Sequence, residues 1–262
     1  MTESDSDQEE VEYEPETFTF ADVTITLTTI AYLPITVLMT NRTKDVEISG
    51  QKLWCGSLVL IRHLLQQSED IFRGALTIEL GAGTGVVSMI SKRLGATRAI
   101  ATDHDQRSLD HMQADSARNG IEIDVERLDW YSPDLSSLHK YTTPPSPSFH
   151  SLYLLAGDVL YKEALLEPFF ITVDRLFTWW EGTFSSATAK GVKLWLCHVP
   201  RAGVTHDLVE STAIRHNLTA TVLEAWMERS EREVRCGGGQ DLVREYAPEE
   251  DTSRAKLYLI TR

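Results

Sequence analysis

The pattern of apolar and polar positions predicts a chain in which strands and helices alternate. Apolar runs rich in β-branched residues indicate strands, and apolar residues three or four positions apart indicate helices. Strands are expected near 75–80, 97–102, 121–128, 151–156, 192–199, 219–227 and 256–261. Helices are expected near 86–94, 106–119, 162–180 and 205–216. This alternation is typical of an α/β fold with a doubly wound, mostly parallel, seven-stranded sheet that helices cover on both faces.

The segment before residue 75 differs from this alternation. Residues 23–30 alternate with period two and are rich in threonine and isoleucine, and residues 35–39 repeat the pattern. Both stretches indicate N-terminal strands added to the α/β fold, while residues 58–67 have helical spacing. We therefore expect a β extension over residues 18–48 and a ligand-binding α/β domain over residues 49–262.

The acidic residues are concentrated at the start of the chain. The net charge of the 262 residues is −14, and residues 1–16 hold eight carboxylates but no lysine or arginine. This composition is typical of disorder, so we expect an acidic disordered arm over residues 1–17. The rest of the chain has no basic stripe. This argues against direct binding of nucleic acid and favours a partner that is basic.

The cysteines and histidines do not indicate a metal or disulfide framework. Cys55, Cys197 and Cys236 are odd in number and include no Cys-x-x-Cys pair. His104 and His111 lie seven positions apart, but two histidines without a third ligand do not make a catalytic zinc site. No signal peptide or bilayer-spanning run is recognisable, so we expect an intracellular protein that needs no metal and no membrane.

Three glycines form the most informative motif. Gly81, Gly83 and Gly85 stand between an expected buried strand and an expected helix, and a turn without Cβ atoms lets a ligand approach the backbone. A dinucleotide fingerprint would place its third glycine at position 86, which is Val86. Glu79 adds a carboxylate that would repel a pyrophosphate and attract an amine or a sulfonium. The turn therefore favours S-adenosylmethionine over NAD.

Further candidates stand at the ends of the next two strands, where doubly wound sheets bind ligands. Asp103 follows Gly81 by 22 residues, where a carboxylate binds both hydroxyls of an adenosine ribose; alternatively it caps the following helix. Asp129 offers an acceptor for an adenine amino group, and Trp130 an aromatic face beside the ring. The alternative for Trp130 is a place in the core.

Asp158 and Tyr161 follow the fourth strand. If this turn is helical, both side chains point to one face, toward the reactive methyl of the cofactor. Together they can bind and orient a substrate amine, because methyl transfer chiefly needs in-line positioning of a deprotonated nucleophile. The alternative is that Asp158 caps the next helix and Tyr161 packs in the core. Pro200 and Arg201 follow the fifth strand and are expected in one wall of the substrate entrance.

Taken together, these motifs resemble the seven-strand lysine methyltransferases of the methyltransferase-like group. The resemblance covers about residues 48–200 and rests on Gly50-Gln-Lys-Leu-Trp54, Glu79-Leu-Gly-Ala-Gly-Thr-Gly85, Asp103, Leu128-Asp-Trp130 and Asp158-Val-Leu-Tyr161. It implies a cofactor pocket lined by Trp54, Gly81, Ala82, Gly83, Asp103, Trp130 and Ala156, with Asp158 and Tyr161 at the substrate mouth. From its residue type alone, Trp54 would be assigned to the core or to an interface.

The resemblance also implies an activity. It predicts a protein-lysine N-methyltransferase that uses S-adenosylmethionine, releases S-adenosylhomocysteine and acts as a monomer, in the nucleus or the cytoplasm, on a protein substrate. One alternative is a small-molecule or nucleic-acid methyltransferase, although Asp158-Val-Leu-Tyr161 differs from the Asn-Pro-Pro-Tyr type of tetrad that points to base amines. The other is a catalytically silent binding module, which would lack affinity for the cofactor.

Overall fold

A seven-stranded sheet forms the centre of the protein. The structure, a computed structural model, describes residues 11–32, 49–142, 149–184, 191–223, 234–236 and 249–262. The sheet has the order β5-β4-β3-β6-β7-β10-β8, and β10 runs antiparallel to both of its neighbours while the other pairs are parallel. Its strands are β3 (Ala75–Leu80), β4 (Arg98–Asp103), β5 (Asp124–Arg127), β6 (Ser151–Gly157), β7 (Val192–His198), β8 (Thr219–Val222) and β10 (Lys256–Thr261). The fold class predicted from the sequence is confirmed.

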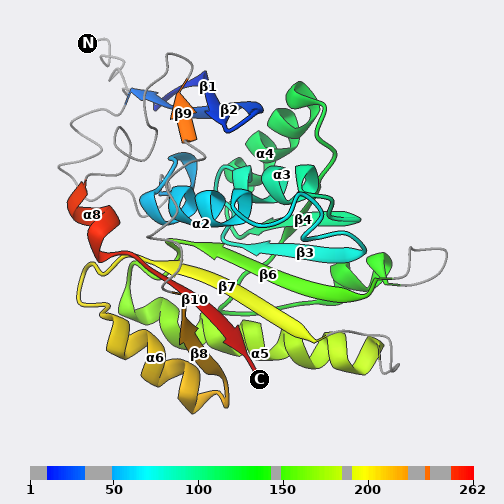
Figure 1. Cartoon of the computed structure of the whole chain (residues 1–262), viewed down its shortest axis with the longest axis vertical. Coiled ribbons are helices and arrows are strands. Elements are labelled where there is room, and N and C mark those ends of the chain that lie inside the picture. Colours follow the sequence, from blue (N-terminus) through cyan, green and yellow to red (C-terminus); the bar gives the residue numbers. More distant parts are fainter. Residues whose placement is uncertain (1–10, 33–48, 143–148, 185–190, 224–233, 237–248) are drawn as a thin grey trace, which may run out of the picture.

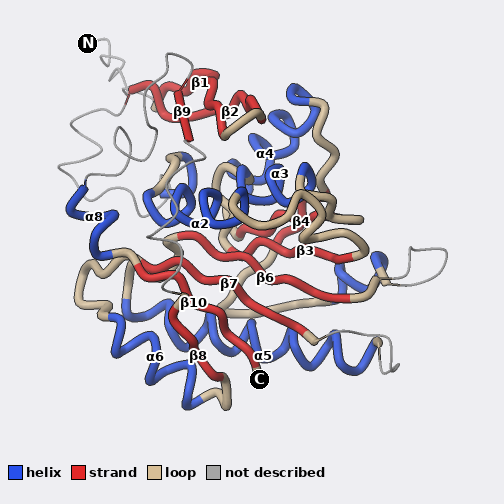
Figure 2. Tube along the Cα trace, in the orientation of Figure 1, coloured by secondary structure: helices blue, strands red, loops and turns tan. Residues whose placement is uncertain are grey.

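Helices cover both faces of this sheet (Figures 1 and 2). One face carries α2 (Cys55–Leu65), α3 (Val86–Arg93) and α4 (Gln106–Asn119), and the other carries α5 (Leu166–Thr183) and α6 (His206–Arg215). Shorter elements are the 3-10 helices η1 (Ser49–Gln51), η2 (Ser136–Tyr141) and η3 (Glu163–Leu165), and α8 (Glu249–Arg254). Because both faces are covered, all six residues of β3 are buried, including the polar residues Thr77 and Glu79.

Local signals in the sequence set the ends of the helices. Asp105 caps α4 by accepting the Ser108 N–H at 2.9 Å, and Gly120 ends this helix with a φ of +60°. Thr205 caps α6 in the same way, through the Leu208 N–H at 3.2 Å. These side chains satisfy backbone donors that a helix leaves unpaired in its first turn.

A second, three-stranded sheet packs over the helices on the α2–α4 side (Figure 1). It has the antiparallel order β2-β1-β9, with β1 (Glu12–Phe20), β2 (Val23–Tyr32) and β9 (Val234–Cys236). The predicted strand over residues 23–30 is confirmed, whereas the one predicted over residues 35–39 lies outside the described residues. Because β9 comes from the C-terminal part of the chain, this sheet is not built from the N-terminal extension alone.

The expectation of a disordered arm over residues 1–17 is wrong for residues 12–17, which belong to β1. Their acidic composition predicted disorder, but apolar and aromatic contacts hold this strand in place. Phe18 and Phe20 are fully buried, and the Tyr13 ring meets the His111 ring edge-on at a centroid distance of 4.9 Å. Tyr13 also accepts a hydrogen bond from Arg107, so β1 lies against α4. Residues 1–10 lie outside the described residues.

Side chains of α4 hold the outer edge of β2. Asn119 donates its amide N–H to the carbonyl oxygen of Thr26 and accepts the Thr26 N–H, both at 2.7 Å. Asp115, which is buried, accepts the Thr28 N–H at 2.6 Å. An edge strand otherwise presents unpaired backbone groups that favour association, and α4 satisfies them here.

We expect Asn119→Ala to loosen the small sheet, because two backbone groups of Thr26 lose their partner. The free energy of unfolding should fall by about 1–3 kcal/mol, and the Thr26 amide should exchange its hydrogen faster. Denaturant unfolding and hydrogen exchange measure the two effects. Gln106→Ala is the control on the same helix, since its hydrogen bond to Asp110 is exposed and its loss should cost less than about 0.5 kcal/mol. Unchanged exchange at Thr26 would contradict this arrangement.

Candidate active site at the carboxyl edge of the sheet

A cavity of about 470 Å³ lies at the carboxyl ends of β3, β4, β5, β6 and β7. Ligands of doubly wound sheets bind at this edge. Most of the residues that the sequence predicted for the site line the cavity: Trp54, Gly81, Ala82, Gly83, Asp103, Asp129, Trp130, Asp158 and Tyr161. Two predicted residues, Glu79 and Ala156, are not among the described residues that line it.

The glycine turn after β3 has the backbone geometry that its sequence predicts. Gly81, Gly83 and Gly85 all have positive φ values, of +64°, +54° and +71°. A Cβ on Gly83 would lie 2.5 Å from the carbonyl oxygen of Gly50, and one on Gly85 would lie 2.8 Å from Met112 Cγ. Only glycine meets both the left-handed conformation and this lack of space.

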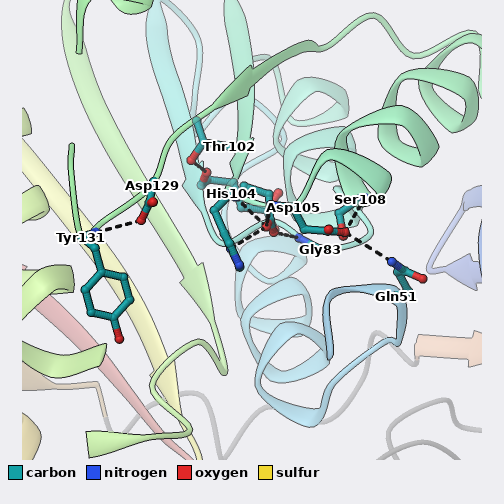
Figure 3. Close-up of polar contacts among 10 residues, drawn as sticks. Gln51, Gly83, Thr102, His104, Asp105, Ser108, Asp129 and Tyr131 are labelled. Carbon is teal, nitrogen blue, oxygen red and sulfur yellow. Dashed lines mark hydrogen bonds and ion pairs between the residues drawn. The ribbon is translucent and has the colours of Figure 1, made fainter. Parts of the chain in front are cut away.

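The segment around η1 lies directly over this turn. A Cβ on Gly50 would come within 2.7 Å of the Ser108 hydroxyl, so this position also has no room for a side chain. Gln51 then extends its amide to Asp105, the cap of α4, at 3.4 Å (Figure 3). The clamped segment leads to Trp54, which explains how a tryptophan that composition alone would assign to the core comes to line the cavity.

Asp103 at the end of β4 is held by three backbone donors. Its Oδ2 accepts the Gly83 N–H at 2.9 Å, and its Oδ1 accepts those of His104 and Asp105 at 2.8 and 3.1 Å. The alternative that Asp103 caps the next helix is wrong, because Asp105 does so. Each carboxylate oxygen accepts about two hydrogen bonds, so Oδ2 retains capacity for a ligand hydroxyl. The side chain of His104 lies 3.3 Å from the same carboxylate.

The loop after β5 forms the next wall. Asp129 turns the chain by accepting the Tyr131 N–H at 2.9 Å (Figure 3). Trp130 is half-buried: a Cβ on Gly81 would lie 3.2 Å from its ring, and its other neighbour is the Phe169 ring, edge-on at 5.1 Å. This tryptophan therefore packs against the core and also lines the cavity, and its contact with an adenine ring stays a prediction.

Glu79 and Ala156 have buried environments instead. Glu79 Oε2 accepts the Ser88 N–H at 2.7 Å and the Ser88 hydroxyl at 2.6 Å, which ties the end of β3 to α3. Burial raises the pKa of Glu79 to about 8, so the carboxyl is mostly protonated at neutral pH. Ala156 is fully buried in β6, and its neighbours Gly157 and Asp158 reach the cavity. A ligand contact by Glu79 or Ala156 stays a prediction.

Asp158 and Tyr161 line one cavity, although the turn between them is not helical. Asp158 has a φ of +61°, a left-handed conformation that aspartate tolerates better than most residues. Its N–H donates to the Cys197 carbonyl at 2.8 Å, and a Cβ on Gly56 would lie 2.7 Å from Asp158 Cβ. The alternative that Asp158 caps the following helix is wrong, because Leu165 precedes α5.

Arg201 pairs with Asp158. Its guanidinium Nη2 lies 2.5 Å from Asp158 Oδ2, and its central carbon lies 5.3 Å from the centre of the Trp54 ring. The Asp158 side chain is only 1% exposed, whereas that of Arg201 is 26% exposed. The sequence placed Arg201 in the entrance wall, but the two residues are 43 positions apart and no local pattern indicates their pairing.

Several lining residues were missed by the sequence analysis. Those with polar side chains are Lys52, Ser57, Thr84, His104, Tyr131 and Lys162. Five of them lie within two residues of a motif residue, which was the available signal. Among the described residues, no three histidine, cysteine, aspartate or glutamate side chains are arranged to hold a metal ion.

The sheet order, the glycine turn and the cavity define a Rossmann-like α/β protein with a nucleotide-type cofactor site. Comparison with known proteins gives the family. A family model for lysine methyltransferases matches residues 36–182, more than half of the 262 residues. The chain belongs to the lysine methyltransferase family, as the motifs predicted, and membership implies S-adenosylmethionine as the methyl donor.

Individual relatives cover different shares of the chain. Human methyltransferase-like protein 22 is 32% identical over 144 residues, 50% of this chain and 35% of that protein. Mouse protein-lysine methyltransferase METTL21E is 31% identical over 135 residues, 51% of this chain and 54% of that protein. Ribosomal lysine N-methyltransferase 5 of Kluyveromyces lactis is 25% identical over 231 residues, 70% of this chain and 71% of that protein. The chain thus spans about a third of the length of the human relative.

We expect Gly83→Ala to impair cofactor binding, because its Cβ would collide with the Gly50 carbonyl. Gly120→Ala is a matched control: its φ is +60°, and among the described residues no atom lies within 4 Å of the added Cβ. Both variants should lose about 1–2 kcal/mol from the left-handed conformation. Only Gly83→Ala should also bind S-adenosylhomocysteine at least about tenfold more weakly, measured by calorimetry. Equal affinity of the two variants would contradict the close approach.

The raised pKa of Glu79 predicts how stability depends on pH. The folded protein keeps a proton on Glu79 up to about pH 8, while the unfolded chain releases it near 4.5. The stabilisation is therefore complete at low pH and is lost as the pH rises through 8, by up to about 1.4 kcal/mol per pH unit.

Denaturant unfolding at several pH values tests this dependence. Glu79→Gln should remove the decline between about pH 5 and 8. Glu167→Gln is the control, because hydrogen bonds from Arg215 and His216 lower the pKa of Glu167 and its titration lies below that range. A decline that persists unchanged in Glu79→Gln would show that another group causes it.

Proposed function

We propose that the protein transfers the methyl group of S-adenosylmethionine to a lysine side chain of another protein. The observation that carries this proposal is one continuous cavity that joins the glycine turn and Asp103 to the Asp158–Tyr161 pair, in a chain of the lysine methyltransferase family. The two ends of the cavity offer different chemistry. One suits the nucleoside of a cofactor, and the other suits an amine.

The first end of the cavity fits the cofactor. Gly83 lines the cavity, and without a side chain it lets a ligand approach its backbone. Asp103 offers an acceptor on Oδ2 for a ribose hydroxyl, and Trp130 provides a ring face beside the turn. When bound, the donor supplies an electrophilic methyl on a sulfonium. Our assignment gives these residues the task of binding and orienting it.

The second end of the cavity suits the amine of a substrate lysine. Asp158 contributes a buried carboxylate and Tyr161 contributes a phenol that can accept or donate a hydrogen bond. These groups orient an amine in the cavity wall, which restricts its approach to one direction. The amine attacks only in its neutral form, so the site must bind lysine without stabilising its ammonium.

The partner is a protein that presents a lysine, and we expect its surface to be basic because the chain has a net charge of −14. We also expect the protein to act as a monomer. Within the described parts of the chain, none of the helices combines the length and the hydropathy needed to span a bilayer.

Transfer of labelled methyl from S-adenosylmethionine into fractionated, nuclease-treated cell lysate tests this function. The wild-type chain should label at least one protein band. Asp158→Asn should reduce labelling by at least about tenfold, because the amide keeps the shape but replaces one of the two acceptor oxygens that orient the amine with a donor. Asparagine tolerates the left-handed backbone at this position, so the variant should fold. Asp174→Asn is the control, since Asp174 lies on α5, pairs with Arg262 and does not line the cavity.

The outcomes separate the alternatives. A nuclease-resistant protein band that depends on Asp158 supports protein methylation. Label that nuclease removes would indicate a nucleic-acid substrate, and label only in small molecules would indicate a metabolite. An absence of thermal stabilisation by S-adenosylmethionine would contradict the cofactor assignment and favour a silent binding module.

A further inference from the structure

The amine end of the cavity already contains a cation of the chain itself. Arg201 places Nη2 2.5 Å from Asp158 Oδ2 and lies over the Trp54 ring at 5.3 Å. Carboxylates and aromatic faces both bind ammonium ions in proteins. Here the guanidinium of Arg201 contacts one group of each kind.

This arrangement matters because a carboxylate alone would oppose the reaction. A negative charge within about 4–6 Å stabilises an ammonium and raises its pKa by about 1–3 units, which leaves less neutral amine to attack. A buried, unpaired Asp158 would therefore bind lysine in the unreactive form. A positive charge beside the carboxylate cancels this effect while the carboxylate keeps its capacity to accept a hydrogen bond from a neutral amine.

We propose that Arg201 is a positioning residue that neutralises Asp158 and so makes the acceptor pocket select the neutral amine of lysine. This inference rests on the proposed function, because it concerns the amine that the site would methylate. Arg201 acts through Asp158 and through its own charge, which repels an incoming ammonium. With this ion pair the site needs no general base. The lysine ammonium loses its proton to solvent before it binds, and the pocket then binds the neutral amine.

Other charged and titratable groups face the same pocket, so they enter the test. They are Lys52, Asp103, His104, Asp129, Tyr131, Tyr161 and Lys162 in the lining of the cavity, with Cys197 near Asp158 and His198 near Arg201. Burial raises the pKa of Cys197 and lowers that of His198 to about 4, so neither titrates between pH 7 and 9. Asp103 and Asp129 stay in place in every variant compared below.

Binding of n-butylamine in the presence of S-adenosylhomocysteine tests the proposal without requiring turnover. At pH 7 this probe is almost entirely n-butylammonium. Arg201→Met should bind it at least about tenfold more tightly than the wild type, because the guanidinium no longer neutralises the carboxylate or repels the probe. Arg201→Lys, which keeps the charge, should resemble the wild type. Arg215→Met is the matched control, since Arg215 also pairs with a carboxylate, Glu167, at 2.5 Å but outside the cavity.

Two results would overturn the proposal: Arg201→Met binding the probe no more tightly than the wild type, or Arg201→Lys behaving like Arg201→Met. If Arg201→Met does not fold, the pH dependence of n-butylamine binding to the wild type tests the proposal by itself. Its affinity for total n-butylamine should increase at least tenfold from pH 7 to pH 9, as the neutral fraction grows, and weaker or unchanged binding would contradict selection of the neutral amine.

The pH profile of methyl transfer gives a second readout. With the acceptor protein found in the lysate assay, the midpoint of kcat should move up by about one pH unit in Arg201→Met and return in Arg201→Lys. An unmoved midpoint would contradict the proposal. Failure of the proposed function would give a different result, because the wild type would then label no protein. The n-butylamine measurements would still show whether the pocket selects a neutral amine over an ammonium.

Discussion

The backbone of residues 50–57 contacts the carboxyl edge of the central sheet at two places where no Cβ fits. At the first, the Gly50 carbonyl lies where a Cβ on Gly83 would come within 2.5 Å. At the second, a Cβ on Gly56 would come within 2.7 Å of Asp158, and one on Gly157 would meet Ser57 at 2.7 Å. A single short segment thus fixes the distance between the glycine turn and the acceptor end of the cavity. Close-packed backbone transmits this constraint better than flexible side chains would.

Three carboxyl groups near this edge are accommodated in three different ways. Glu79 is buried with a raised pKa near 8 and anchors α3 through Ser88. Asp103 accepts hydrogen bonds from three backbone N–H groups, and Asp158 pairs with the guanidinium of Arg201. Burial opposes charge, so each charged group needs its own compensation. The two ends of the cavity differ in this respect. The burial of Asp158 is compensated by the full positive charge of Arg201, and that of Asp103 by the dipoles of backbone N–H groups.

The sequence predicted the central sheet well because its signals are local. Period-two and helical apolar spacing, a glycine turn and helix caps each depend on a few neighbouring residues, and nearly all the predicted strands and helices appear close to their expected bounds. The site residues at strand ends could be predicted for the same reason, since topology brings the ends of parallel strands to one edge. Asp158 and Tyr161 line one cavity, but without the helical turn that their spacing suggested.

The features that the sequence could not reveal depend on distant contacts. The acidic composition of β1 predicted disorder, and it gave no sign that Phe18 and Phe20 in the same strand are buried. β9 has three residues and joins β1 from more than 200 positions away, so no local pattern marks it. The pairing of Arg201 with Asp158 likewise spans 43 positions. For Glu79, the motif predicted a contact with the ligand, but the structure shows a buried hydrogen bond from the Ser88 N–H that the spacing did not indicate.

Helix α4 contacts both the small sheet and the segment that covers the glycine turn, so it links the N-terminal strands to the central α/β fold. At its C-terminal end, Asp115 and Asn119 hold the backbone of β2. At its N-terminal end, Asp105 caps the helix and accepts a hydrogen bond from Gln51, whose segment covers the glycine turn. A boundary near residue 48 therefore does not separate independent units. Because α4 makes both contacts, the N-terminal strands and the segment over the glycine turn pack against the same helix.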